Sequence, residues 1–231
     1  LEKYNKFGYI IFVRLGSKRL PGKALRKINN KPILGYIIER VKKIKPNYKI
    51  IIATTSLKRD KQIVNYCKKM KISYFTGSNN NVMLRAIKCC EKYNIEAFLR
   101  ICADRLYFDF NLATKMLKIF KKNNFDIITN SLKKTFPRGM TCEIIRYDVL
   151  KKSFKFVKRN QDKEHICDYF YRYKKNFKIK NIISKYNKKV PMLNLAIDNL
   201  GDLTKAEKCL KNFKYKTTIH NNKVISYYLK N

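Results

Sequence analysis

Short apolar segments alternate with amphipathic stretches along this chain, and this alternation restricts the possible fold more than any other feature. Residues 9–13 are continuously apolar, which is typical of a strand buried on both faces. A basic loop follows, and residues 31–45 then place Ile33 and Ile37 on one face of a predicted amphipathic helix. Strands that alternate with helices indicate a parallel sheet covered by helices on both sides.

The alternation continues to about residue 130 and then becomes less regular. Further strands are predicted at 49–54, 72–75, 97–102, 125–129, 140–146 and 192–197, with residues 177–183 extended. Further helices are predicted at 59–70, 82–93, 112–122, 148–156, 162–173 and 200–210. The predicted strand 140–146 follows a turn, so it could run parallel or antiparallel to its neighbours. We therefore predict an α/β protein with a three-layer α/β/α, mainly parallel sheet and one domain over residues 1–231.

The loop at residues 14–23 holds two glycines, four cations and a proline. Glycines let backbone amides approach an anion closely, and cations neutralise it. The first strand-to-helix turn of an α/β sheet is a common phosphate site. The loop is not a Walker A motif, because five residues separate Gly16 from Gly22, and Ala24 follows Lys23. It does not match GxGxxG either, and a basic surface turn is the alternative.

Asp104 and Asp198 are candidate metal ligands, since each directly follows a predicted strand. The carboxyl ends of parallel strands share the sheet edge at which the basic loop begins. Two carboxylates together with phosphate oxygens suit Mg²⁺. The alternative for each aspartate alone is a cap on the next helix. Their joint position beside the loop favours the metal site.

The composition limits the partners and the compartment. The formal net charge of +38 suggests a nucleic-acid binder, but lysines occur in every segment together with abundant Asn, Ile, Tyr and Phe, which favours compositional drift. The seven scattered cysteines predict reduced, mostly buried thiols and no zinc site in a cytoplasmic protein. No apolar run has membrane-spanning length and no secretory signal is expected, so we predict no membrane partner.

The motifs together resemble those of the SpsF-like and acylneuraminate (CMP-KDO synthetase-type) cytidylyltransferases. The matching residues are Arg14-x-Gly16-Ser17-x-Arg19-Leu20-Pro21-Gly22-Lys23, Lys31-Pro32-Ile33-Leu34, Ala53-Thr54-Thr55, Phe75-Thr76-Gly77-Ser78, Val82 with Arg85, Arg100-Ile101-x-x-Asp104, Asp109, Pro137-Arg138-Gly139, Glu143, Glu164-His165 and Ile197-Asp198-x-x-x-Asp202-Leu203. Their order and approximate spacing span nearly the whole chain.

The resemblance implies a GT-A-like (Rossmann-like) nucleotidyltransferase fold. It implies a Mg²⁺-dependent enzyme that transfers CMP from CTP to an acidic, ulosonic-type sugar and releases pyrophosphate, for surface polysaccharide or glycan biosynthesis. Residues 1–130 would form the nucleotide-binding part, and residues 131–231 the sugar-binding part. The enzyme would be a cytoplasmic homodimer, with residues 137–146 contributing to self-association.

The resemblance also assigns roles to individual residues. Nucleotide contacts are expected from Arg14, Leu15, Gly16, Ser17, Arg19, Lys23, Arg85 and Asp104. Asp104 and Asp198 would bind Mg²⁺, and these two with Arg14 and Lys23 form the expected catalytic set. Sugar contacts are expected from Arg138, Glu143, Glu164 and His165. As alternatives, Glu143 and Glu164 could form structural salt bridges, and His165 could lie in the core or on a helix surface. Arg85 could lie on a solvated helix face.

Departures from the family pattern leave two other functions open. SpsF-like proteins typically have Gly-Asp-Cys-Pro where this chain has Ala103-Asp104-Arg105-Leu106. Residues 79–81 are all Asn where acids are frequent, and Thr141 stands where Asp is common. One alternative is therefore a catalytically impaired family member that acts as a binding or scaffold module. The other is a basic nucleic-acid-binding protein, suggested by charge alone.

Overall fold

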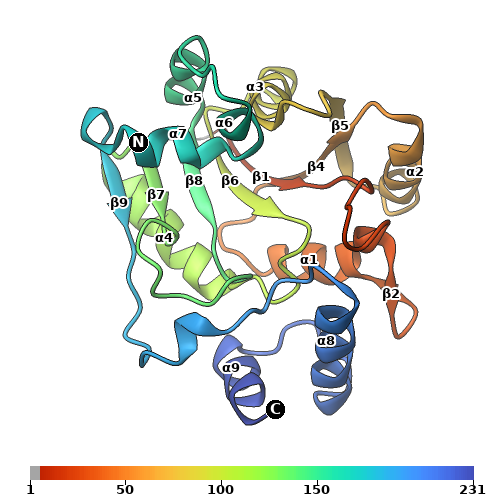
Figure 1. Ribbon diagram of the computed structural model, residues 1–231. Helices are drawn as coiled ribbons and strands as arrows, with labels where there is room; N and C mark the ends of the chain where they lie inside the picture. The colour runs from red at the N-terminus through yellow and green to blue at the C-terminus, as the bar shows by residue number, and fades with distance from the viewer. Residues whose placement is uncertain (1–5) are drawn as a thin grey trace.

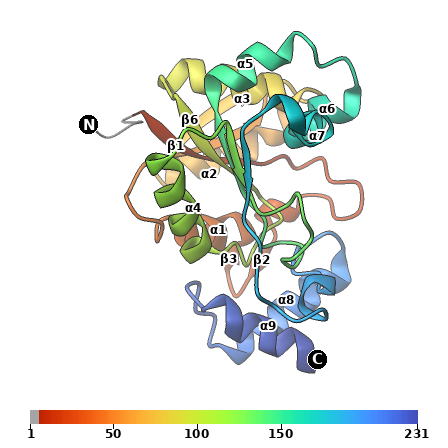
Figure 2. The same cartoon turned by 90° about the vertical axis from the view of Figure 1, so that its left-hand side faces the viewer.

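A central sheet lies between two layers of helices in the computed structural model, which describes residues 6–231 (Figure 1, Figure 2). Its seven strands are β1 (Phe7–Phe12), β4 (Lys49–Thr55), β5 (Ser73–Gly77), β6 (Ala97–Cys102), β7 (Ile127–Thr129), β8 (Glu143–Arg146) and β9 (Ile179–Asn181), in the spatial order β5-β4-β1-β6-β8-β7-β9. Neighbours from β5 to β6 are parallel, β8 is antiparallel to both β6 and β7, and β9 is parallel to β7. The mainly parallel, three-layer prediction is confirmed.

The helices divide between the two faces of the sheet and one end of the molecule. They are α1 (Ile33–Val41), α2 (Lys61–Lys69), α3 (Val82–Tyr93), α4 (Phe110–Lys122), α5 (Tyr147–Phe154), α6 (Asn160–Glu164), α7 (Ile166–Arg172), α8 (Leu200–Asn212) and α9 (Asn221–Lys230). Short 3-10 turns lie at Lys23–Leu25, Lys58–Asp60, Lys174–Asn176 and Val190–Met192, and β2 (Lys27–Ile28) pairs with β3 (Lys31–Pro32). Helices α1, α2 and α4 share one core with α8 and α9, and α3, α5 and α7 share the other (Figure 1).

Strand β1 shows why its sequence is apolar at every position. Tyr9 and Ile11 join the core under α1 and α4, whereas Ile10 and Phe12 join the core under α3. Alternate side chains of a strand point to opposite faces, so a central strand with helices on both sides needs apolar residues throughout. This places the carboxyl end of β1, and the basic loop that follows it, at the middle of one sheet edge.

Two helix predictions differ from the structure by more than a shift of one or two residues at an end. The helix predicted over 31–45 begins only after Pro32, because residues 31–32 pair with β2 instead. The helix predicted over 162–173 is two helices, α6 and α7, which meet at His165. The backbone of His165 has φ −104° and ψ 83°, which are not helical values.

The strand predicted over 192–197 is wrong. This segment makes one isolated bridge, from Asn194 to Arg138, and otherwise crosses the sheet edge without joining the sheet. Its backbone is held by long-range hydrogen bonds: the Leu195 amide donates to the Arg138 carbonyl at 2.8 Å, and the Ile197 amide donates to the Asp104 carbonyl at 2.9 Å. Asp198 therefore lies at the end of this irregular segment and not, as predicted, at the end of a strand of the sheet.

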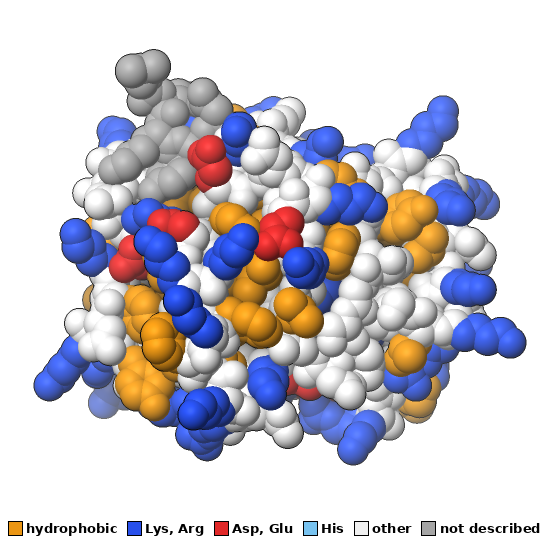
Figure 3. Space-filling model, turned by 90° about the horizontal axis from the view of Figure 1, so that it is seen from above, with side chains coloured by type: hydrophobic (Ala, Val, Ile, Leu, Met, Phe, Trp, Pro, Cys, Tyr) orange, Lys and Arg blue, Asp and Glu red, His pale blue; other side chains and the backbone are white. Residues whose placement is uncertain are grey.

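Several composition-based expectations can be compared with the structure directly. All seven cysteines are free, and all but Cys102 are buried, as predicted. Over residues 6–231, no helix has both the length and the apolar character that a membrane crossing requires. On the face shown in Figure 3, Lys and Arg side chains are scattered among neutral and apolar ones, with no single basic stripe.

Candidate active site

The basic loop between β1 and α1 is fixed by hydrogen bonds at both ends. The Gly22 amide donates to the Leu15 carbonyl at 3.0 Å, and the Leu15 amide donates to the buried Asp60 carboxylate at 2.8 Å. Gly22 has φ +70°, a conformation that favours glycine. Both backbone groups of Leu15 thus have partners within the protein and its side chain is buried, so Leu15 supports the loop and does not line the neighbouring cavity.

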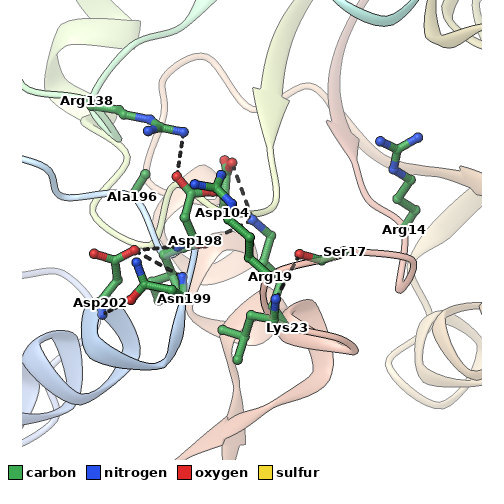
Figure 4. A network of polar contacts seen from close by, with 12 residues as sticks. Arg14, Ser17, Arg19, Lys23, Asp104, Arg138, Ala196, Asp198, Asn199 and Asp202 are labelled. Carbon is green, nitrogen blue, oxygen red and sulfur yellow. Dashed lines mark hydrogen bonds and ion pairs between the residues drawn. The ribbon is translucent and has the colours of Figure 1, made fainter.

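Lys23, at the end of this loop, lies between the two aspartates that follow β6 and the 193–197 segment (Figure 4). Its ammonium group is 3.7 Å from Asp104 and 3.3 Å from Asp198, and it donates to the Ile197 carbonyl at 2.9 Å. The structure therefore brings together the loop and both candidate metal ligands.

Asp198 is the most enclosed member of this cluster, with 4% of its surface exposed. Besides Lys23, the guanidinium groups of Arg19 and Arg138 approach its carboxylate to 3.1 Å and 2.5 Å. Its backbone amide donates to Asp202 at 2.9 Å, which fixes the orientation of the residue. Three cations around one buried carboxylate make this a strongly polarised point in the molecule.

Neither candidate metal ligand caps a helix. The cap of α4 is Asp109, whose carboxylate accepts from the amides of Asn111 and Leu112. The cap of α8 is Asn199, in a reciprocal capping box with Asp202. Asp104 and Asp198 therefore do not have the helix-capping role that was the alternative interpretation for each of them.

A cavity of about 570 Å³ opens above the cluster and the loop. Ten of the predicted site residues line it: Arg14, Gly16, Ser17, Arg19, Lys23, Arg85, Asp104, Glu164, His165 and Asp198. Within residues 6–231, five buried polar atoms of lining residues have no hydrogen-bond partner, namely Asn79 Oδ1, Arg85 Nε, Arg100 Nε, Asp104 Oδ1 and Asp198 Oδ2, although Asp198 Oδ2 makes an ion pair with Arg138. Buried polar groups are normally satisfied, so such atoms indicate a place for a polar ligand.

Arg85 lies inside the protein and not on a solvated helix face, so that alternative is wrong. Its guanidinium donates to the Ser78 carbonyl at 3.1 Å and lies 5.8 Å from the centre of the Phe12 ring. Burial, and after it the nearby Arg14 guanidinium, lower the pKa of Arg85 to about 10. The group therefore keeps its charge at neutral pH.

Arg14 forms an ion pair with Glu164, which joins the loop to α6. Glu164 was assigned to the sugar, yet it lines the same cavity as the phosphate-loop residues and not the second cavity described next.

A second cavity, of about 650 Å³, adjoins the first and holds the remaining predicted sugar contacts, Arg138, Glu143 and His165. Glu143 lies directly opposite Arg100 across β8 and β6, with 3.0 Å between the charged groups. Burial alone would raise the pKa of Glu143, but Arg100 and Arg105 outweigh it and hold this pKa below its usual range. Glu143, in the wall of the second cavity, thus forms the structural ion pair that was the alternative to a sugar contact.

The sequence profile of the cytidylyltransferase family matches residues 9–227. The chain belongs to the cytidylyltransferase family.

Individual relatives agree with this membership. An uncharacterised protein of Methanocaldococcus jannaschii is 33% identical over 193 residues, covering 84% of this chain and 78% of that protein. The spore coat polysaccharide biosynthesis protein SpsF of Bacillus subtilis is 24% identical over 205 residues, covering 86% and 83%.

Solved structures support the same conclusion. A cytidylyltransferase structure from Leptospira borgpetersenii superposes with a TM-score of 0.91 at 28% identity, covering 97% of this chain and 94% of that one. CMP:2-keto-3-deoxy-manno-octonic acid synthetase complexed with CTP superposes with a TM-score of 0.69 at 13% identity, covering 90% and 100%. The second likeness concerns the fold alone, and it confirms the predicted nucleotidyltransferase architecture.

Two departures of this cytidylyltransferase from the SpsF-like pattern contact each other. Arg105 donates to the backbone carbonyl of Thr141 and also lies 3.6 Å from Glu143. Both Arg105 and Thr141 line the second cavity. An arginine in place of Cys and a threonine in place of Asp make this cavity more cationic and leave the aspartate pair intact.

The aspartate pair fits a divalent cation that also binds phosphate. Within residues 6–231, no cluster of three or more His, Cys, Asp or Glu side chains is arranged to hold a metal. Asp104 and Asp198 would supply two oxygen ligands, and phosphate oxygens and water would supply the others, as Mg²⁺ prefers. The unpartnered Oδ1 atom of Asp104 agrees with such a role.

Two contacts in the cavity walls were not predicted from the sequence, namely the pairing of Arg100 with Glu143 and the approach of Arg59 to Gly16. Arg100 and Glu143 are opposite charges inside otherwise apolar strands, which predicts a cross-strand pair. Arg59 lies over the loop: its guanidinium would be 2.5 Å from a Cβ on Gly16. Nothing local in the sequence indicates that contact.

Replacing Gly139 by Ala is expected to lower the free energy of unfolding by about 2 kcal/mol and CTP turnover at least about tenfold. Gly139 has φ +96°, and an added Cβ would lie 2.5 Å from the Leu195 backbone, which leads to Asp198. The matched control is Gly22→Ala, because that position also has positive φ but open space around the Cβ. Urea unfolding of both variants measures the difference, and equal losses would contradict the steric argument.

Proposed function

We propose that this cytidylyltransferase transfers CMP from CTP to an acidic, ulosonic-type sugar, releasing pyrophosphate, in the biosynthesis of a surface polysaccharide or glycan. The main observation in support is the cationic second cavity that adjoins the cavity of the loop and the aspartate pair. Arg105, Lys134 and Arg138 line it, and guanidinium groups are well suited to a sugar carboxylate. The relative SpsF of Bacillus subtilis is a spore coat polysaccharide biosynthesis protein, which supports the polysaccharide part.

The loop supplies the positive charge that a nucleotidyl transfer needs. Arg14, Arg19 and Lys23 would bind the triphosphate, and the amides of Gly16 and Ser17 would add hydrogen bonds. When a sugar oxygen attacks the α-phosphate, charge grows on the phosphate oxygens and on the leaving pyrophosphate, and preorganised cations stabilise it.

Each of these cations now contacts a carboxylate, and a bound nucleotide would replace those partners. Glu164 pairs with Arg14, and Asp198 pairs with both Arg19 and Lys23. Asp104 and Asp198 would hold Mg²⁺, which when bound neutralises phosphate charge and orients the nucleotide.

The test is a pyrophosphate-release assay with added pyrophosphatase and phosphate detection, across four nucleoside triphosphates. The acceptors are a panel of ulosonic acids and matched neutral sugars, each with Mg²⁺ or with EDTA. We expect release only with CTP, a sugar acid and Mg²⁺. A rise in Tm with CTP and Mg²⁺ but no turnover with any acceptor would favour the impaired family member. Metal-independent RNA binding with a steep salt dependence would favour the nucleic-acid binder.

A homodimer is also part of the proposal, although residues 137–146 offer only part of their surface to a partner. Most of residues 137–146 are buried within the chain, and β8 lies between β6 and β7. The side chain of Arg138, 59% exposed, is the main exception. Light scattering of the purified protein tests the dimer, and a monomer mass at micromolar concentration contradicts it.

A further inference from the structure

The two cavities share a boundary that is lined by two side chains. Among the described residues, only Arg100 and His165 line both cavities. In the proposed reaction the α-phosphate lies in the first cavity, and the acceptor sugar lies in the second. The new bond between the sugar oxygen and phosphorus must therefore form at the boundary between the two cavities.

Only one of these two side chains is available to the reactants. Arg100 is buried and its guanidinium is held by Glu143. The His165 side chain is exposed to the cavities, and within residues 6–231 its ring makes no hydrogen bond or ion pair. An imidazole nitrogen with no other partner, at the place where an O–H bond must break, can accept a proton.

The backbone holds His165 in a fixed position. The residue ends α6 and begins α7, and its amide donates to the Gln161 carbonyl at 2.7 Å. Its carbonyl accepts from the Asp168 amide at 2.9 Å. A side chain carried on such a junction between two helices is oriented better than one on a free loop.

We propose that His165 is the general base of the transfer reaction; this inference rests on the proposed function. The imidazole takes the proton of the attacking sugar hydroxyl as the oxygen–phosphorus bond forms. The bond between the α-phosphorus and the bridging oxygen then breaks, pyrophosphate leaves with that electron pair, and the imidazolium returns its proton to water. No further reactant is needed.

The charges around His165 have both signs. Five acids line the two cavities with it, Glu164 and Asp168 from its own segment and Asp104, Glu143 and Asp198 from other elements. The ten cations that line them all come from other elements: Arg14, Lys18, Arg19, Lys23, Arg59, Arg85, Arg100, Arg105, Lys134 and Arg138. Because only the neutral imidazole can accept a proton, the rate must fall as the pH is lowered.

The test compares the pH profiles of kcat/KM for the acceptor, at saturating CTP and Mg²⁺. For the wild-type protein we expect a tenfold fall per pH unit on the acid side. For His165→Gln we expect a rate about 10²–10⁴-fold lower, mainly in kcat, and no acid limb. Added imidazole should restore part of the activity of His165→Ala, because a small base can occupy the vacated space.

The chain offers a matched control, since His220 is its only other histidine. His220 caps α9, where its ring accepts from the Asn222 amide, and it does not line either cavity. His220→Asn should keep the wild-type rate and acid limb.

If folded His165→Gln is slow but keeps the acid limb, or keeps the wild-type rate, His165 is not the base, although the proposed function stands. Absence of turnover in the wild-type protein with every acceptor would contradict the proposed function itself, and the inference with it.

Discussion

Asp104→Asn is expected to lower Mg²⁺-dependent CTP turnover by about 10²–10³-fold and to leave the fold intact. The variant is nearly isosteric but removes one of the two charges that would hold the metal beside Lys23. It also removes repulsion between the carboxylate and the triphosphate. Binding of CTP in EDTA should therefore be unchanged or tighter, while its enhancement by Mg²⁺ disappears.

Calorimetric titration of CTP with and without Mg²⁺, alongside the pyrophosphate assay, separates these effects. The matched control is Asp148→Asn, because Asp148 is a partly exposed aspartate that pairs with Arg146 and does not line either cavity. This control should behave as wild type. Turnover retained by Asp104→Asn, with its Mg²⁺ response intact, would remove Asp104 from the metal site.

The parts of the fold that the sequence predicts well are those determined by local periodicity. Helix α3 has the predicted bounds, and β1 is continuously apolar because both of its faces are covered. Residues 192–197 were mistaken for a strand because their largely apolar run resembles one. Their amides pair with carbonyls of Asp104 and Arg138, and such distant partners leave no periodic signal.

The same distinction applies to the site. The loop and Asp104 could be found because each directly follows a strand and the ends of parallel strands share an edge. Asp198 was placed at that edge by an incorrect strand, while Glu164, predicted as a sugar contact, lines the cavity of the basic loop. Contacts such as Arg59 over Gly16 depend on how two loops pack, which no local pattern encodes.

Helix α9 was not predicted, and a buried arginine far from the site explains how it is held. Arg40 on α1 is 1% exposed, and burial lowers its pKa to about 10, so it is charged at neutral pH. Its guanidinium donates to Phe108 O, Thr217 O, Ile219 O and Asn221 Oδ1, at 2.6–3.0 Å. One side chain thereby ties α1 and the loop before α4 to the segment that leads into α9.

Arg40→Met is expected to lower the free energy of unfolding by about 3–5 kcal/mol, because it leaves these four oxygens without their donor inside the protein. Arg40→Lys should recover only part of this loss, since an ammonium group cannot reproduce the planar fork. The control is Arg159→Met: Arg159 is exposed, and its side chain makes no hydrogen bond or ion pair within the described part of the chain, so a change within about 0.5 kcal/mol is expected. Urea unfolding measures the stability, and hydrogen exchange should show α9 losing protection first in Arg40→Met. Equal stability of the two methionine variants would mean that α9 is held by its apolar contacts alone.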